Sequence, residues 1–435
     1  MNLPSNNLFF NKKDEGSFDN IKNLKTIAQP SLDNANIHVK RFPNPYQAIL
    51  AICSDLDETP DKNVYFETMR FLNTNEETTM GRGVGLEVGN TIYFDMPPNQ
   101  FAYWNTDDTG RTLVREFIRS GHIDCLHSYG DLATTREHAA RALDELDRHN
   151  CKLKVWVDHG AAPTNFDGDI MKGSGDVIGS PAYHADLTIA SGVEYVWRGR
   201  VTSIIGQNVQ RHYKGIWNAS HPFCSSKTLL KEITKGLLGQ YGNKKYAMHA
   251  PNRILQTINL RDGQQIFEFM RCNPHWGGVS SCETASGINE VLTSTFLDTL
   301  VANQAACILY THLGKTPSQE GVLPKESRQA FFRLSSYVAE EKILVTTTYR
   351  LLTYYRMLEE AHLHVKEIDD KIVVDIQYTG PKEDLDGLTF QLPRPRYVII
   401  SHNGRELNLK QFKIVDNEDL FTVSLPWHPL DFPQE

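Results

Sequence analysis

The sequence predicts an α/β fold built as a (β/α) barrel and followed by a small all-β domain. Between residues 46 and 365, short apolar runs alternate with helical patterns, and the links between them are short. This order is typical of a parallel sheet. After residue 365 the pattern changes to alternating strands punctuated by Pro, Gly and Asn-Gly. We therefore expect an irregular lead-in over 1–45, the barrel over 46–365 and the β domain over 366–435.

Each element of the barrel region follows from its hydrophobic spacing. Short apolar runs predict buried strands, and segments with one apolar face predict helices, as Ala139, Leu143 and Leu146 do. The expected strands lie within 48–53, 123–129, 151–160, 187–199 and 305–314, the expected helices within 64–74, 134–150 and 324–340, and a short strand with a long helix within 343–364.

Alternating strands dominate the C-terminal region. The stretch "SHNGRE" at 401–406 predicts a hairpin, because Asn-Gly favours tight turns between antiparallel strands. Upstream, the Gly- and Asp-rich stretch 161–181 predicts a long loop on the active face of the barrel. The expected C-terminal strands lie within 371–380, 388–407 and 421–427.

Composition narrows the classes of partner. The chain has 435 residues, of which 40% are hydrophobic and 23% charged, as in an ordinary globular protein. The net charge of −8 gives no electrostatic basis for binding nucleic acid or an anionic membrane. No apolar run reaches about 18 residues, so we expect no membrane span. The first twenty residues lack the apolar core of a signal peptide. Seven irregularly spaced cysteines indicate reduced thiols and a cytoplasmic location, with the oligomeric state left open.

Polar side chains collect where the expected strands end. In a barrel these ends converge on one face. Neutral imidazoles and carboxylates are the ligands that Zn²⁺ and other divalent ions prefer, so this face is a candidate metal or acid/base site. The residues are Asp55 and Asp57 after strand 48–53, His127 and Asp131 after 123–126, Asp158 and His159 after 153–157, and His312 after 307–311.

The acidic run that begins at Asp55 has two interpretations. Crowded carboxylates repel and raise each other's pKa unless a cation or protons neutralise them, which predicts a divalent ion here. Alternatively the run is a solvated turn with a helix cap, since Asp is a favoured cap residue. Cys53, Cys125 and Cys307 lie in apolar runs, and we expect them to be small buried hydrophobes.

Two further stretches suggest substrate contacts. The stretch 94–108 is dense in aromatic and amide side chains, which suits either stacking on a sugar ring or a packed surface loop. In "EYVWRGR", an arginine such as Arg198 beside Trp197 could clamp a carboxylate or phosphate, or pair with a neighbouring Asp. The stretch 272–283 lacks the ligand spacing of a structural zinc site.

The order of these motifs resembles the polysaccharide deacetylase (NodB-homology) family, within the glycoside hydrolase/deacetylase barrel superfamily. "SDLDE" matches the first family motif, and "HSYGD" matches the second with Asp131 in the place of its second His. "LYTHLG" resembles the last motif, with His312 one residue later. "WVDHG" occupies the place of the family's Arg-containing motif. The resemblance covers about residues 45–355 and implies a seven-stranded or distorted barrel.

The resemblance implies a carbohydrate-active hydrolase, namely a metal-dependent deacetylase of an N- or O-acetylated sugar or polysaccharide. The metal expected first is Zn²⁺, while Mn²⁺, Fe²⁺ and Mg²⁺ stay open because Asp131 makes the ligand set harder. The implied roles are general base for Asp55, general acid for His312, metal ligands for Asp57, His127 and Asp131, and substrate binding for Asp158, His159, Trp197 and Arg198.

Three alternatives stay open. His159 could be the third metal ligand while Asp131 orients His127 from behind. If the metal has been lost, Asp55, Asp57 and Asp158 would supply the paired carboxylates of a metal-independent glycoside hydrolase. The third alternative is a catalytically inactive barrel that binds sugar.

Overall fold

The computed structural model describes most of the chain from residue 37 onward. The described ranges are 37–56, 58–160, 162–274, 284–317, 322–368, 371–392, 397–407, 413–416 and 421–433. The predictions for Asp57 and for residues 1–36 of the lead-in lie outside these ranges.

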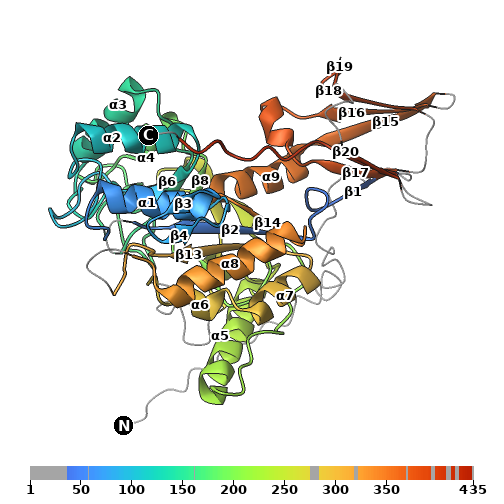
Figure 1. Cartoon of the computed structure of the whole chain (residues 1–435). Coiled ribbons are helices and arrows are strands. Elements are labelled where there is room, and N and C mark those ends of the chain that lie inside the picture. The colour runs from blue at the N-terminus through green and yellow to red at the C-terminus, as the bar shows by residue number, and fades with distance from the viewer. Residues whose placement is uncertain are drawn as a thin grey trace, which may run out of the picture.

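A large, mostly parallel sheet forms the centre of the molecule (Figure 1). Its strand order is β10-β11-β8-β7-β6-β5-β2-β13, β14 also pairs with β2, and the β10–β11 pair alone is antiparallel among these ladders. The α/β class is therefore confirmed. The strands are β2 (Ala48–Ser54), β5 (Gly89–Ile92), β6 (Ile123–His127), β7 (Val155–Val157), β8 (Tyr195–Trp197), β10 (Leu255–Asn259), β11 (Gln265–Phe269), β13 (Ala306–Thr311) and β14 (Ile343–Thr346).

Hydrogen bonding does not close this sheet into a barrel in the described part of the chain, where no ladder joins β10 to β13. Two short strands extend the far end instead. β9 (Val201–Thr202) follows β8, β12 (Arg271–Cys272) follows β11, and the two pair in parallel. β12 lies alongside β13, which brings Arg271 toward the carboxyl end of the sheet.

Three strands of the sheet were not expected from the sequence. β5 is short and polar, so its pattern has no apolar run to indicate a strand. β10 and β11 alternate buried and more exposed residues and are joined through Asp262-Gly263, where Gly263 has φ 92°. An Asp-Gly pair between alternating segments is a hairpin signal, so this pair of strands could have been predicted.

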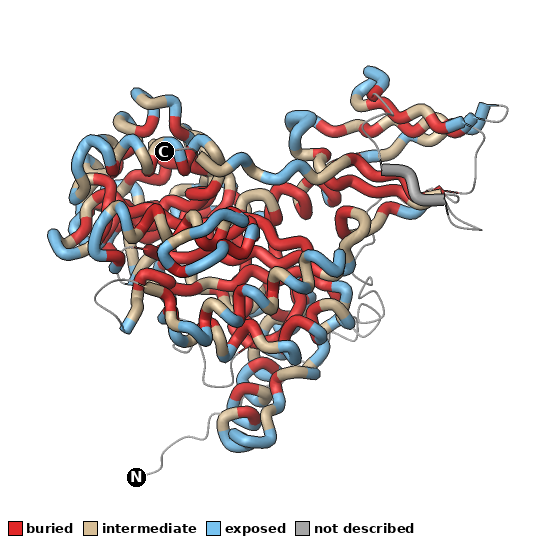
Figure 2. The backbone as a smooth tube through the Cα atoms, in the orientation of Figure 1, coloured by how far each residue is buried: buried red, intermediate tan, exposed pale blue. Residues whose placement is uncertain are grey.

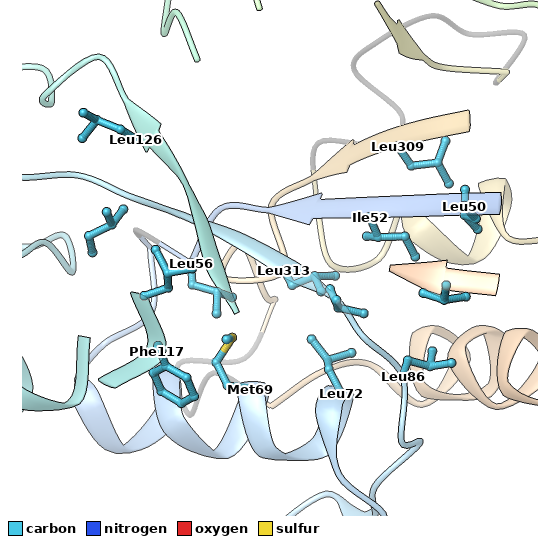
Figure 3. Close-up of a cluster of buried hydrophobic side chains, with 14 of the residues drawn as sticks. Leu50, Ile52, Leu56, Met69, Leu72, Leu86, Phe117, Leu126, Leu309 and Leu313 are labelled. Carbon is cyan, nitrogen blue, oxygen red and sulfur yellow. The ribbon is translucent and has the colours of Figure 1, made fainter. Parts of the chain in front are cut away.

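Successive residues of a strand point to opposite faces of the sheet. The side chains on one face of this sheet pack against helices. Leu50 and Ile52 of β2 join a buried cluster with Met69 of α1 and Phe117 of α2 (Figure 3). The helices of the described chain are α1 (Lys62–Asn73), α2 (Asp108–Arg119), α3 (Arg136–Arg148), α4 (Ala185–Ala190), α5 (Pro222–Gln240), α6 (Ile288–Val291), α7 (Ser294–Ala302), α8 (Lys325–Ala339) and α9 (Thr348–Glu360).

The opposite face of the sheet packs against α9 and the C-terminal strands. Ile49 and Ala51 of β2 share a buried cluster with Leu351 of α9 and with Phe390 and Val423 further along the chain. Figure 2 shows that the central strands are buried while exposed residues lie on the surrounding helices and turns. The hydrophobic core is thus continuous between the central sheet and the C-terminal strands.

The region after residue 361 supplies seven strands of two four-stranded sheets, and β1 near the start of the described chain supplies the eighth. The predicted hairpin at 401–406 is confirmed, with Ser401 paired to Glu406. The helix that was expected within 343–364 ends at Glu360. The assignment of residues 366–435 to a separate β domain stays a prediction. One sheet has the order β15 (His362–Ile368), β16 (Lys371–Gln377), β18 (Tyr397–His402), β19 (Arg405–Glu406); the other has β1 (His38–Val39), β17 (Thr389–Leu392), β21 (Phe421–Ser424), β20 (Lys413–Asp416).

Two further findings concern membrane-spanning helices and the loop expected at 161–181. No helix among the described residues is long and apolar enough to cross a membrane. The stretch expected as a loop contains no helix or strand over its described residues 162–181, and α4 begins at Ala185.

Candidate active site

The carboxyl ends of β2, β6 and β13 bring three of the expected site residues together. Asp55 directly follows β2, His127 is the last residue of β6, and His312 directly follows β13. Because parallel strands end at the same edge of a sheet, residues 72 to 257 positions apart meet there. Nε2 of His127 and Nε2 of His312 each lie 3.3 Å from Oδ2 of Asp55.

Asp55 is completely buried and held by three hydroxyl groups. The hydroxyl of Tyr93 donates to Oδ2 at 2.9 Å, Tyr310 also donates to Oδ2, and Thr91 donates to Oδ1. Sequence reasoning missed all three donors. Tyr310 carried a usable signal, since it lies two residues before His312 and so shares its face of the strand.

The tyrosine hydroxyl of Tyr310 connects the two imidazoles. It lies 3.3 Å from Nε2 of His127 and 3.1 Å from Nε2 of His312. Since this hydroxyl donates to Asp55, it can accept from the imidazoles, which places a hydrogen on each Nε2. The lone pair is then on Nδ1. In both histidines Nδ1 is buried and has no hydrogen-bond partner in the described part of the chain.

The electrostatics of this cluster favour an ionised carboxylate between neutral imidazoles. Burial raises the pKa of Asp55, but His127, His312 and the Thr91 hydroxyl outweigh it and hold that pKa well below its usual range. Burial lowers the pKa of His127 and of His312 to about 4, although Asp55 opposes the shift. At neutral pH each imidazole can therefore accept a proton beside a negative charge.

His159 and Asp131 form a second pair beside the first cluster. Nδ1 of His159 lies 2.8 Å from Oδ1 of Asp131, and the His159 ring packs edge-on against His127 with centroids 4.7 Å apart. Asp131 is thus paired with His159, and the nearby His127 also helps to lower the pKa of Asp131. The local cause is the turn after β6, where Ser128, Tyr129 and Gly130 have φ of 48°, 63° and 108°. This left-handed turn directs Asp131 toward β7.

Asp158 anchors the loop that follows β7. It is fully buried and accepts hydrogen bonds from Nε1 of Trp156 at 2.7 Å and from the backbone N–H groups of Phe166 and Asp167, both at 2.9 Å. Burial raises the pKa of Asp158 to about 7, against the three N–H donors. Asp158 lines the pocket, and its two bonds to backbone N–H groups tie it to the following loop at Phe166 and Asp167.

Trp197 and Arg198, the other two expected substrate contacts, have different surroundings. The Trp197 ring stacks on Tyr310 with centroids 6.2 Å apart, and its Nε1 donates to the backbone oxygen of Arg200 at 2.9 Å. Arg198 is mostly buried and donates from Nε to Glu268 at 2.9 Å. Its charge is therefore already paired within the protein.

A pocket of about 420 Å³ opens beside these groups, and its lining includes His127, His159, Trp197, Arg271, Tyr310 and His312. Asp55 is not among the described lining residues and has no exposed surface. Asp55 consequently reaches a bound molecule only through the imidazoles and hydroxyls that contact it. Arg271, at the end of the unexpected β11–β12 segment, was missed because that segment was not predicted.

Among the described residues, one group has its metal-ligating atoms within 4.8 Å of one another, namely Cys53, Asp124 and Cys125. The two sulfur atoms are 3.7 Å apart, and Asp124 accepts from the backbone N–H of Tyr349 at 2.8 Å, at the start of α9. Burial raises the pKa of the Cys125 thiol well above its usual range, which favours the thiol over the metal-binding thiolate. The burial expected for Cys53, Cys125 and Cys307 is confirmed.

The sequence was also compared with known proteins. It matches no protein-family model, and no curated protein is similar to it.

Proposed function

We propose that the protein is a hydrolase that removes an acetyl group from an N- or O-acetylated sugar. The observation that carries this proposal is the ionised, fully buried Asp55 between two neutral imidazoles at 3.3 Å, beside a pocket lined by His127, Trp197 and His312. Neutral imidazoles that border a pocket can exchange protons with a bound molecule. Trp197 and Tyr310 offer aromatic surface for a sugar ring.

The proposed fold is a distorted barrel, in agreement with the family resemblance. β12 alongside β13 and the bridge between Gln207 and Ala306 bring the two sides of the sheet near closure. In such a barrel the site lies at the carboxyl ends of the strands, where Asp55, His127 and His312 are found.

In the proposed reaction, Nδ1 of His312 accepts a proton from the attacking water and then gives that proton to the leaving amine or alcohol. This nitrogen is buried without a hydrogen-bond partner in the described chain, and the ring lines the pocket. Asp55 was expected to act as a base on water. Because it lies behind His127, Tyr310 and His312, we assign it the role of a positioning residue. It orients both rings and stabilises the charge that a protonated imidazole carries.

The residues present are chemically suited to a divalent metal. Nδ1 of His127 is buried without a partner in the described chain, while its Nε2 faces a carboxylate, the usual arrangement behind a metal-bound imidazole. His159 packs against His127 and is joined to Asp131, and these three residues would hold the ion after moving closer together, because their ligating atoms do not all lie within 4.8 Å of one another. A divalent ion held there (Zn²⁺, Mn²⁺, Fe²⁺ or Mg²⁺) would supply Lewis-acid chemistry toward an acyl carbonyl and a water of lowered pKa.

Acetate release tests the proposed activity directly. The purified protein, incubated with each metal in turn, should release acetate from at least one acetylated monosaccharide or oligosaccharide. His312→Gln should reduce the rate by about 100-fold or more, the usual contribution of a general acid. The control is His362→Gln, because His362 is exposed on β15 and is not among the described residues that line the pocket. Wild-type-like turnover in His312→Gln would contradict the proposal.

A thermal melt tests the metal independently of turnover. Protein stripped with EDTA should gain stability on addition of one of the four ions. Binding to the folded state alone contributes roughly 2.7 kcal/mol at a hundredfold excess over Kd. His127→Gln should abolish the shift. If no ion shifts the melting temperature of the stripped protein, the metal-dependent form of the proposal fails.

A metal-independent glycoside hydrolase is the second candidate, and one observation favours it. The environments of two carboxyls push their pKa values apart: that of Asp55 lies well below the usual range, and that of Asp158 is raised to about 7 by burial. Such a separation is typical of the acid and base of glycosidases. The three N–H groups that donate to Asp158 argue against this candidate, because they occupy the carboxylate oxygens that an acid or base would need. Release of reducing ends by EDTA-treated protein would favour this candidate.

A further inference from the structure

Arg271 is a buried cation without an ionic partner in the described part of the chain. Its side chain is 1% exposed, and none of its three guanidinium nitrogens has a hydrogen-bond partner there. Burying an unpaired charge is costly, because water no longer solvates it and nothing replaces the lost interactions. Such a group requires a compensating anion from somewhere else.

Nearby acidic residues are already occupied by other arginines. Glu268, on the neighbouring strand β11, accepts from Nε of Arg198 at 2.9 Å and lies 3.4 Å from Nε of Arg200. Arg200 also lies 3.8 Å from Asp167. Among the described residues, no acidic group forms an ion pair with Arg271, and Asp55 is linked to it only through Tyr310.

Two aromatic rings pack against the guanidinium group. Its central carbon lies 4.1 Å from the ring centre of Trp197 and 4.1 Å from that of Tyr310. Cation–π attraction offsets part of the cost of burial. Because the two ring centres are only 6.2 Å apart, the rings lie on adjacent sides of the guanidinium group and do not enclose it.

Arg271 belongs to the pocket already described. Together with His127, Trp197, Tyr310 and His312 it lines the same 420 Å³ space. An anion bound to Arg271 would therefore be part of the molecule that the imidazoles act on. The remaining cation of the lining, Lys315, lies 3.2 Å from Glu58 and so already has an acidic neighbour.

We propose that Arg271 binds the carboxylate of an acidic sugar, so that the substrate is an acetylated uronic acid or a glycan that contains one. The identification of this ligand as the substrate rests on the proposed function. A carboxylate matches the edge of a guanidinium group with two parallel N–H···O bonds; phosphate can do the same, so the titration below includes it. Tyr310 links both parts of the site, since it stacks against Arg271 and donates to Asp55.

Calorimetric titration of the full-length protein tests the carboxylate without requiring turnover. The probes are glucuronate, the neutral glucuronamide and inorganic phosphate. We expect glucuronate to bind at least about tenfold more tightly than glucuronamide, a difference typical of one charge-assisted bidentate contact. Equal affinities for these two probes, or binding of phosphate alone, would overturn the proposal.

Three variants sharpen the test. Arg271→Met removes the charge and should abolish the preference for glucuronate, while its melting temperature should not fall because an uncompensated buried charge is lost. Arg271→Lys keeps the positive charge but loses the two parallel N–H donors of the guanidinium group, so it should weaken glucuronate binding about tenfold. The control Arg82→Met changes an exposed arginine and should bind like the wild type. Unchanged glucuronate affinity in Arg271→Met or Arg271→Lys would contradict the assignment.

Turnover separates this inference from the proposed function. If the protein deacetylates neutral and acidic sugars with equal kcat/KM, the inference fails and the hydrolase proposal stands. If it binds glucuronate through Arg271 but releases no acetate from any sugar, the hydrolase proposal fails and the carboxylate site stands.

Discussion

At the residue scale, the turn after β6 determines which partner Asp131 has. Gly130 has φ 108°, and a Cβ atom at this position would lie 2.3 Å from the backbone oxygen of Asp95. Only glycine therefore allows the turn that brings Asp131 to His159. The two left-handed residues before it, Ser128 and Tyr129, store strain next to the site, a feature that is common around active sites.

Gly130→Ala should lower the free energy of unfolding by roughly 1–3 kcal/mol and reduce acetate release, because Asp131 moves away from His159. Urea denaturation measures the first effect. The matched control is Gly81→Ala, since Gly81 has φ 96° but nothing within 4 Å of the added Cβ. Gly81→Ala therefore introduces the strain of an alanine with a positive φ, but no steric clash of the added Cβ. Equal losses of stability in the two variants would contradict the steric argument.

At the element scale, the acidic run after β2 serves two separate purposes. Helix α1 begins at Lys62, and its cap is Asp61, whose Oδ1 accepts from the backbone N–H of Asn63 at 2.7 Å and of Val64 at 3.0 Å. Asp55 is not a cap but lies buried at the strand end. The cap interpretation of this run is thus confirmed at Asp61, while Asp55 belongs to the candidate site.

Asp61→Ala should lower the free energy of unfolding by about 1 kcal/mol, the usual contribution of a cap, and leave kcat unchanged. Asp55→Asn should instead abolish turnover, because the amide cannot stabilise a protonated imidazole. Chemical denaturation and acetate release, measured on both variants, separate the two roles. Loss of turnover in Asp61→Ala with an intact fold would show that the cap also contributes to the site.

At the scale of the whole molecule, buried titratable groups control the response to acid. Some histidines are buried in a neutral form, and two carboxyls are buried against their ordinary preference for charge. Burial lowers the pKa of His122, His127, His184, His249 and His312 to about 4, and raises that of Asp124 and Asp158 to about 7.

These two sets act in opposite directions. A histidine with a folded pKa of about 4 takes up its proton first in the unfolded chain, where the value is about 6.5, so stability falls as the pH falls from 6.5 to 4. A carboxyl with a folded pKa of about 7 takes up its proton first in the folded chain, so stability rises over the same range. The histidines outnumber the carboxyls among the described residues with these shifts.

The free energy of unfolding should therefore decrease between pH 7 and pH 5, which urea denaturation at several pH values measures. His184→Gln should reduce this slope, because His184 is buried outside the candidate site, where Nδ1 contacts Thr188 and Nε2 contacts the backbone oxygen of Thr164, both at 2.8 Å. His362→Gln, at an exposed histidine of β15, controls for the substitution itself. A flat or rising profile toward acid would contradict the assignment of neutral buried histidines.

The sequence by itself determined the α/β class and the location of several site residues. Apolar runs of the right length predict β2, β6, β7 and β13, because a buried parallel strand must be apolar on both faces. Polar residues directly after such runs must lie at the carboxyl edge of the sheet. For this reason Asp55, His127 and His312 could be grouped in advance.

Only the tertiary structure decided which atoms meet and which charges stay unpaired. Thr91 and Tyr310 reach Asp55 from positions 36 and 255 residues away, and no local pattern encodes such contacts. Asp131 is paired with His159 because a left-handed turn lies between β6 and Asp131. The charge of Arg198 is neutralised by Glu268. Arg271 acquires its role because β12 lies beside β13. Pairing and burial depend on distances between remote segments, and periodicity in the sequence constrains only neighbours along one strand or helix.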